Sequence, residues 1–111
     1  MTAPPTEFQA DEAARRALDE QLYTLVGRPV REVRITRVRR NEGLRWVALV
    51  IGLNGKEVPL YDRGLHHTAA VILRAAFPDA DWSVAQDYTV RTGSLTRRST
   101  AMPAGLRGGR R

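Results

Sequence analysis

Cysteine is absent from the sequence, which excludes disulfide bonds and cysteine-based metal sites. Long hydrophobic runs are absent as well: no stretch reaches the roughly eighteen apolar residues of a transmembrane helix, so we predict no membrane contact. The segment up to Arg16 lacks the basic start and following apolar stretch of a secretory signal. Because no export signal is present, we predict a cytoplasmic protein by default, and the absence of cysteine adds nothing to this prediction.

Histidine is scarce, since only His66 and His67 occur. Adjacent helical side chains point about 100° apart, so this pair is poorly placed to hold one metal ion, and Asp62 adds only a third ligand. We therefore predict no metal site, no cofactor and no catalytic residue, with one histidine packed at a helix edge and the other in solvent. A small enzyme with His66 or His67 as general base is an alternative, although no nucleophile motif accompanies the pair.

Positive charge is concentrated late in the chain of 111 residues, whose net charge is +6. All twelve acidic residues lie at or before Asp87, and twelve of the eighteen lysines and arginines lie there too, so this part is neutral. The excess follows Asp87 as a basic C-terminal arm, which can neutralise phosphates without reading bases. The arm contains Arg91, Arg97, Arg98, Arg107, Arg110 and Arg111.

Residues 6–26 are predicted to form a helix. Thr6 and Gln9 have the spacing of a capping box, and Gly27 followed by Pro29 is a usual helix stop. Apolar residues at helical spacing predict the face that packs against the rest of the domain. They are Ala14, Leu18, Leu22 and Leu25.

Residues 30–40 are predicted to form a strand. Val33 and Ile35 share one parity, whereas Val30 and Val38 have the other. A bulge or twist near Thr36 would reconcile the two sets. The turn at 41–43 then leads into a second strand, which we expect to be an antiparallel neighbour.

The second strand, residues 46–51, reads WVALVI and is apolar at every position. This composition is expected of a strand that is covered on both faces or lies at the centre of a sheet. Asn54-Gly55 predicts a hairpin into a third strand over residues 56–61. Because Pro59 cannot donate a ladder hydrogen bond, that strand is expected at an edge or to be irregular there.

A second helix is predicted from the N-cap Asp62 to Phe77, where Pro78 ends it. After it, apolar residues of one parity predict a strand over residues 83–92, and residues 95–98 are expected to pair back briefly. The predicted core consists of Trp46, Ala48, Leu49, Val50, Ile51, Leu65, Ala69, Ile72, Leu73 and Phe77.

These elements predict an α+β domain: an N-terminal helix, a three-stranded antiparallel sheet, a second helix, a C-terminal strand or hairpin, and then a basic flexible tail. We assign residues 1–5 to a flexible N-terminus, residues 6–98 to a single domain and residues 99–111 to the disordered tail.

The order of elements over residues 6–77 resembles that of a double-stranded-RNA-binding domain, on topology alone. Members of that family carry a histidine in the first hairpin loop and a lysine-rich start of the last helix. Here the loop is Asn41-Glu42-Gly43, and the helix opens with Arg63-Gly64-Leu65-His66-His67. The resemblance implies RNA binding, but the residues that would grip phosphate differ.

We predict an accessory or regulatory protein that binds DNA or RNA weakly through backbone contacts, with no enzymatic activity. The alternative is a protein-interaction or self-association module, in which the arm meets an acidic protein or a sheet edge pairs with a second copy to form a homodimer. The predicted nucleic-acid-binding residues are Arg37, Arg39, Arg40, Arg91, Arg97, Arg98, Arg107, Arg110 and Arg111.

Overall fold

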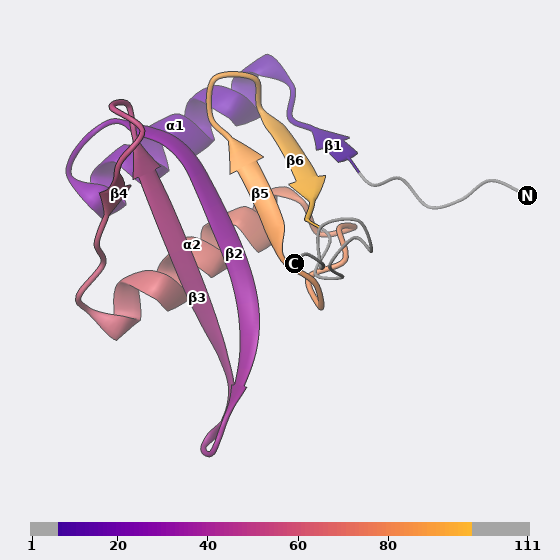
Figure 1. Cartoon of the computed structure of the whole chain (residues 1–111). Coiled ribbons are helices and arrows are strands. Elements are labelled where there is room, and N and C mark those ends of the chain that lie inside the picture. The colour runs from indigo at the N-terminus through magenta and orange to yellow at the C-terminus, as the bar shows by residue number, and fades with distance from the viewer. Residues whose placement is uncertain (1–6, 99–111) are drawn as a thin grey trace, which may run out of the picture.

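The computed structural model describes residues 7–98, which form two helices and one six-stranded antiparallel sheet (Figure 1). The strand order across the sheet is β1-β6-β5-β2-β3-β4, and both helices lie on the same face. In chain order the elements are β1 (Glu7–Gln9), α1 (Glu12–Val26), β2 (Val30–Arg40), β3 (Gly43–Gly52), β4 (Glu57–Val58), α2 (Arg63–Ala76), β5 (Gln86–Thr89) and β6 (Ser94–Arg97).

The expected three-stranded sheet is wrong, because β1, β5 and β6 extend the same sheet. β5 pairs with β2 on the side opposite to β3, and β6 continues outward from β5. Tyr88 on β5 and Leu95 on β6 are both fully buried. A two-stranded hairpin with such large apolar side chains must cover them, and joining the existing sheet places them under the same helices.

The N-terminal helix is shorter than predicted. It begins after Asp11, whose carboxylate accepts from the Ala14 amide at 2.8 Å, so Asp11 is the N-cap in place of Thr6. The preceding residues form β1, in which half-buried Phe8 pairs with Leu95. The capping-box spacing was therefore misleading: the segment 7–9 supplies the outer strand of the sheet. Gly27, at φ 86°, ends the helix as predicted.

A row of apolar residues crosses the whole sheet under the helices. It is defined by the strand register, in which each member lies opposite the next. Its members are Phe8, Leu95, Tyr88, Val33, Val50 and Val58. Of the predicted core, Ala48, Val50, Ala69, Leu73 and Phe77 are buried, whereas Trp46, Leu49, Ile51, Leu65 and Ile72 are only half-buried.

The predicted irregularity of β2 exists but lies elsewhere. The register shifts between Val30 and Glu32, so Val30 joins the buried face while Val38 remains on the face away from the helices. β4 covers only two residues rather than 56–61, and it lies at the sheet edge, as Pro59 predicts. The segment 83–92 likewise contains a strand of only four residues, β5.

Tyr88 carries a hydroxyl that is buried without a hydrogen-bond partner among residues 7–98. An unsatisfied buried hydroxyl is destabilising, so we expect Tyr88→Phe to raise the free energy of unfolding at pH 7 by about 1 kcal/mol. Chemical denaturation of both proteins measures this difference. The exposed Tyr23 is the control, because Tyr23→Phe removes a hydroxyl that water already reaches.

The same substitution should change the alkaline limb of stability. Burial raises the pKa of the Tyr88 phenol above its ordinary value of 10.0. As the pH rises, the unfolded chain therefore loses this proton at a lower pH than the folded protein. The contribution of the protonated phenol to the free energy of unfolding is complete below pH 10, and it is lost as the pH rises through the higher folded value. In Tyr88→Phe the free energy of unfolding should fall less steeply above pH 10 than in the wild type. An equally steep fall in both proteins would contradict this reasoning.

Candidate nucleic-acid interface

The hairpin of β2 and β3 projects beyond the rest of the sheet (Figure 1). Its two strands pair along their length, from Val30 opposite Gly52 to Arg40 opposite Gly43. β5 pairs with β2 only up to Ile35, and β4 pairs with β3 only at Val50 and Ile51. Residues 36–47 therefore pair only with each other, and we call them the basic ribbon.

Four arginines and a single acidic residue lie on the basic ribbon. The acid, Glu42, pairs with Arg45 at 3.4 Å. Within residues 7–98, no carboxylate lies at ion-pair distance from Arg37, Arg39 or Arg40. These three guanidinium groups are thus available to an external anion.

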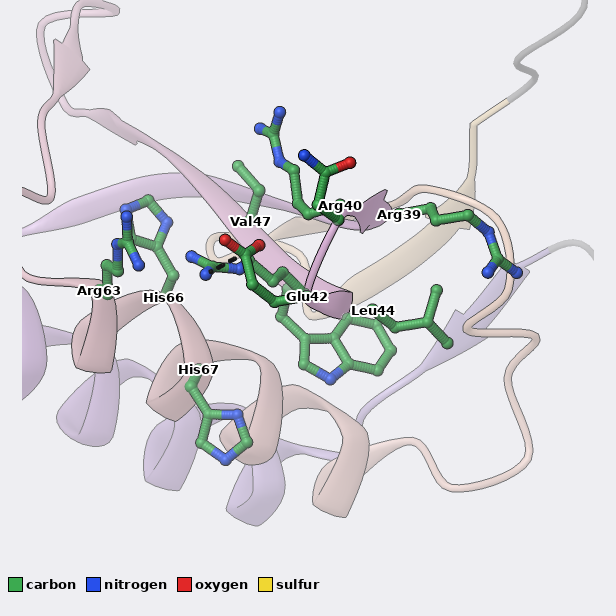
Figure 2. Close-up of a pocket in the computed structure, with 11 residues that line it drawn as sticks. Arg39, Arg40, Glu42, Leu44, Val47, Arg63, His66 and His67 are labelled. Carbon is green, nitrogen blue, oxygen red and sulfur yellow. Dashed lines mark ion pairs between the residues drawn. The ribbon is translucent and has the colours of Figure 1, made fainter.

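The arginines of the basic ribbon lie on both of its sides. Arg37 is opposite Trp46 and Arg39 opposite Leu44, on the side of the sheet that faces the helices. Strand alternation places Arg40 on the other side, and Figure 2 shows Arg39 and Arg40 projecting in different directions. The ribbon therefore presents positive charge to two sides at once.

An open cleft of about 1100 Å³ lies between the basic ribbon and the start of α2 (Figure 2). Arg63, His66 and His67 line it from the helix, which adds a further cation next to the ribbon. The Arg74 guanidinium lies over the Trp46 ring, 4.7 Å from its centroid. This ring face is therefore already occupied and is not free to stack on a base.

His66 has a structural role in this cleft. Its Nδ1 accepts from the Ala48 amide at 3.0 Å, and its Nε2 is 2.8 Å from the Leu60 carbonyl oxygen, to which it donates. Both ring nitrogens are thus bound to backbone, which leaves neither free for a metal ion or for proton transfer. His67 is exposed, and Figure 2 shows it pointing away from the ribbon arginines.

The potential third ligand, Asp62, is engaged as well, because its carboxylate accepts from the Gly64 amide at 2.8 Å and caps α2. Over residues 7–98, no group of three or more histidine or acidic side chains is arranged to hold a metal ion. None of the helices in that range is long and apolar enough to cross a membrane.

β6 finishes at the same end of the sheet as the basic ribbon. β6 runs antiparallel to β5, which runs antiparallel to β2, so β6 points the same way as β2, toward the ribbon. Hydrogen bonds from the Ser83 hydroxyl and amide lower the pKa of Asp81. The charges of Arg97, which lies opposite Gln86, and of Arg37 lower it further. The chain therefore leaves the domain close to the ribbon.

The other predicted arginines divide into three cases. Arg98 Nη1 pairs with the Asp87 carboxylate at 3.2 Å, and that carboxylate also binds Arg34 at 2.9 Å. Arg91 lies in the turn after β5, at the opposite end of the sheet from the ribbon, where its carbonyl accepts from Arg15. The remaining arginines, Arg107, Arg110 and Arg111, lie outside the described residues.

Two residues of the site were not predicted as binding residues. Arg45 lies opposite Val38 on β2, and Arg63 opens α2 beside the ribbon. Extending the predicted pairing of the two strands around the turn at 41–43 would have found Arg45. Arg63 required the packing of α2, because no sequence signal relates the helix start to the ribbon.

Comparisons of the chain with protein-family models, with curated proteins and with solved structures found no match. The candidate interface is therefore defined by its geometry and charge.

Proposed function

We propose that this protein binds nucleic acid through phosphate contacts made by the basic ribbon and by Arg107, Arg110 and Arg111 of the C-terminal arm. The observation that supports this most strongly is the projecting ribbon, on which Arg37, Arg39 and Arg40 lack a carboxylate partner in the described chain. Elsewhere, Arg34 and Arg98 share the Asp87 carboxylate. Guanidinium groups fork onto phosphate oxygens, which makes unpaired arginines on a projection suitable for a phosphate backbone.

Duplex DNA is the substrate class that fits the ribbon best. A two-stranded β-ribbon can enter the major groove of B-form DNA, which is about 12 Å wide. There the arginines on the two sides of the ribbon would face the phosphates of the two groove walls. The A-form major groove of duplex RNA is deep and narrow, and side chains do not reach into it.

Binding is expected to be weak and insensitive to sequence. The three free ribbon arginines and the three arm arginines after Arg98 are few contacts, consistent with non-specific dissociation constants of roughly 10⁻⁴ to 10⁻⁶ M at physiological salt. Tyr88 is buried and cannot stack on a base. These properties suit an accessory or regulatory protein in the cytoplasm, which is part of the proposal.

Three charge-neutralising variants of the full chain test the proposal. The first carries Arg37→Gln, Arg39→Gln and Arg40→Gln, and the second carries Arg107→Gln, Arg110→Gln and Arg111→Gln. The control carries Arg28→Gln, Arg31→Gln and Arg91→Gln, at exposed positions near the opposite end of the sheet. All three lose the same charge, so their differences report the location of the contact.

We expect the ribbon variant to reduce the slope of log affinity against log salt by about 2.7, because each phosphate contact contributes about 0.9 for B-form DNA. The arm variant should lose a similar amount, and the control should match the wild type. Fluorescence anisotropy with duplex DNA, single strands and duplex RNA gives these slopes. The arm arginines are substituted rather than removed by truncating the chain after Ser94, because that truncation would remove most of β6.

If the salt slope fell by the same amount in all three variants, the result would contradict a defined interface. It would indicate that net charge alone attracts the nucleic acid. Absence of binding to every nucleic acid near physiological salt would contradict the proposal as a whole. The arginines would then be assigned to an acidic protein partner. Stronger binding to duplex RNA than to duplex DNA would contradict the placement of the ribbon in a major groove.

A further inference from the structure

The face of the sheet away from the helices carries an apolar stripe. Val47, Leu49 and Ile51 on β3 point to this face, as does Val38 on β2, and all four are only half-buried. None of the helices and strands formed by residues 7–98 lies over it (Figure 1). We call it the open face. Its composition explains why residues 46–51 have the pattern of a strand covered on both faces, although residues 7–98 cover only one of them.

Charge on the open face is opposite at its two ends. At one end, the register places Ile51 of β3 between Glu32 of β2 and Glu57 of β4. At the other end, Arg45, which pairs with Glu42 at 3.4 Å, lies opposite Val38, and Arg40 lies one row further along. Neither Glu32 nor Glu57 has an ion-pair partner within the described part of the chain.

The two charged ends of the open face lie at equal distances from Ala48 along β3. Arg45 and Ile51 are each three residues from Ala48, which lies between Val47 and Leu49 of the stripe. Near the middle of the face, Arg34, opposite Leu49, is bound at 2.9 Å to Asp87, a carboxylate that Arg98 shares. A two-fold axis at Ala48 would therefore bring Val47 of one copy over Leu49 of the other. It would also bring each basic end to an acidic end.

We propose that a second copy of this chain covers the open face, with the two β3 strands antiparallel about a two-fold axis near Ala48. In this arrangement Arg45 of one copy lies over the partner's Ile51, between the partner's Glu32 and the partner's Glu57. An interface with two-fold symmetry must be self-complementary, and in this arrangement the apolar centre of one copy meets that of the other while each basic end meets an acidic end. An acidic or a basic partner of another kind would complement only one end.

The proposed dimer does not depend on the function of the basic ribbon. Arg37 and Arg39 lie on the helix side of the sheet, so they remain accessible when the open face is covered. The two ribbons would then extend from opposite ends of the assembly. Arg40 and Arg45 lie on the covered face, so insertion of both sides of one ribbon into a major groove requires the monomer. Self-association through this face differs from pairing at the β4 edge, which offers only two residues and is followed by Pro59.

Sedimentation equilibrium of the nuclease-treated full chain tests the proposal, because a monomer has a mass of 12.4 kDa. The wild type should sediment as a dimer at concentrations of about 10–100 μM. Leu49→Lys places an unpaired charge at the centre of the interface and should weaken association about a hundredfold or more. The matched control is Val71→Lys on α2, an exposed valine in the helix layer that should leave the dimer intact.

A charge exchange separates loss of the interface from loss of the fold. Arg45→Glu and Glu57→Lys should each weaken association about tenfold, because each creates like-charge contacts across the interface. The double variant reverses both signs and should restore association to within about threefold of the wild type. Circular dichroism should show the same fold for all variants.

Three results would overturn the proposal. The first is a wild type that remains monomeric at concentrations up to about 500 μM, which would leave the face to another occupant. The second is a dimer that persists in Leu49→Lys, which would place the contact elsewhere. The third is a double charge variant that is no better than the single variants, which would exclude the antiparallel arrangement.

Discussion

His66→Phe is expected to lower the free energy of unfolding by about 2–4 kcal/mol, because each buried polar group that loses its partner costs about 1–3 kcal/mol. The substitution keeps a planar ring of similar size but removes both nitrogens. It would leave the Ala48 amide and the Leu60 carbonyl without the partners they have now. In a domain of this size the melting temperature should fall by about 10 °C or more.

The reason for this large effect lies in the shape of the sheet. β4 pairs with β3 only at Val50 and Ile51, so the next amide on that edge, Ala48, has no strand beside it. Ala48 is itself buried, and water therefore does not easily replace the lost bond. The imidazole of His66 takes the place of a strand there and joins α2 to the sheet edge.

His67→Phe is the matched control, since it makes the same change one residue later on the exposed side of α2. It should alter stability by no more than about 0.5 kcal/mol, as is usual at the surface. His66→Gln, which retains one donor and one acceptor, should recover part of the loss. Equal melting temperatures for His66→Phe and His67→Phe would show that the two backbone contacts contribute nothing.

Leu95→Ala is the second substitution with a large expected effect. Leu95 is fully buried on β6, between Phe8 of β1 and Tyr88 of β5 in the apolar row. Truncation of a buried leucine to alanine costs about 2–5 kcal/mol through lost transfer energy and the cavity that remains. The result distinguishes an integral strand from a segment that pairs only briefly before a flexible tail.

Thr96→Ala, on the adjacent exposed residue, should change stability by less than about 0.5 kcal/mol. Denaturant unfolding measures both variants. Hydrogen exchange adds a local readout, because amides of β1 and β5 should lose protection in Leu95→Ala before those of α2. A loss below 1 kcal/mol for Leu95→Ala would be evidence against the six-stranded arrangement, since it falls below the range of about 2–5 kcal/mol for a buried leucine.

The local elements that the sequence predicts well are those whose signals act over a few residues. Asp62 and Pro78 bracket α2, which spans Arg63–Ala76, because a cap and a proline act on the backbone next to them. Gly27 ends α1 for a similar reason. Thr6 was misleading because a capping box is only a local preference, and pairing of Phe8 with Leu95 outweighed it.

Which strands belong to the same sheet, in contrast, could not be predicted from the local sequence pattern. Tyr88 and Leu95 predict buried strand positions, but alternation does not state which strand lies beside which. β5 pairs with the far side of β2, more than fifty residues earlier, and this contact turns an expected small sheet into a six-stranded one. The arginines were divided by the same pairing, which placed Arg97 at the ribbon end and Arg91 at the other.

The amino-acid sequence by itself determined the two helices, the hairpin of β2 and β3, and the excess of arginine, because propensity, capping and charge are properties of neighbouring residues. Only the tertiary structure decided that residues 36–47 project as a ribbon, that His66 completes the edge of β3, and that the stripe of Val47, Leu49 and Ile51 has no cover within residues 7–98. These features depend on where long-range strand pairing begins and ends. That boundary is set by packing between segments distant in the chain, which no local signal encodes.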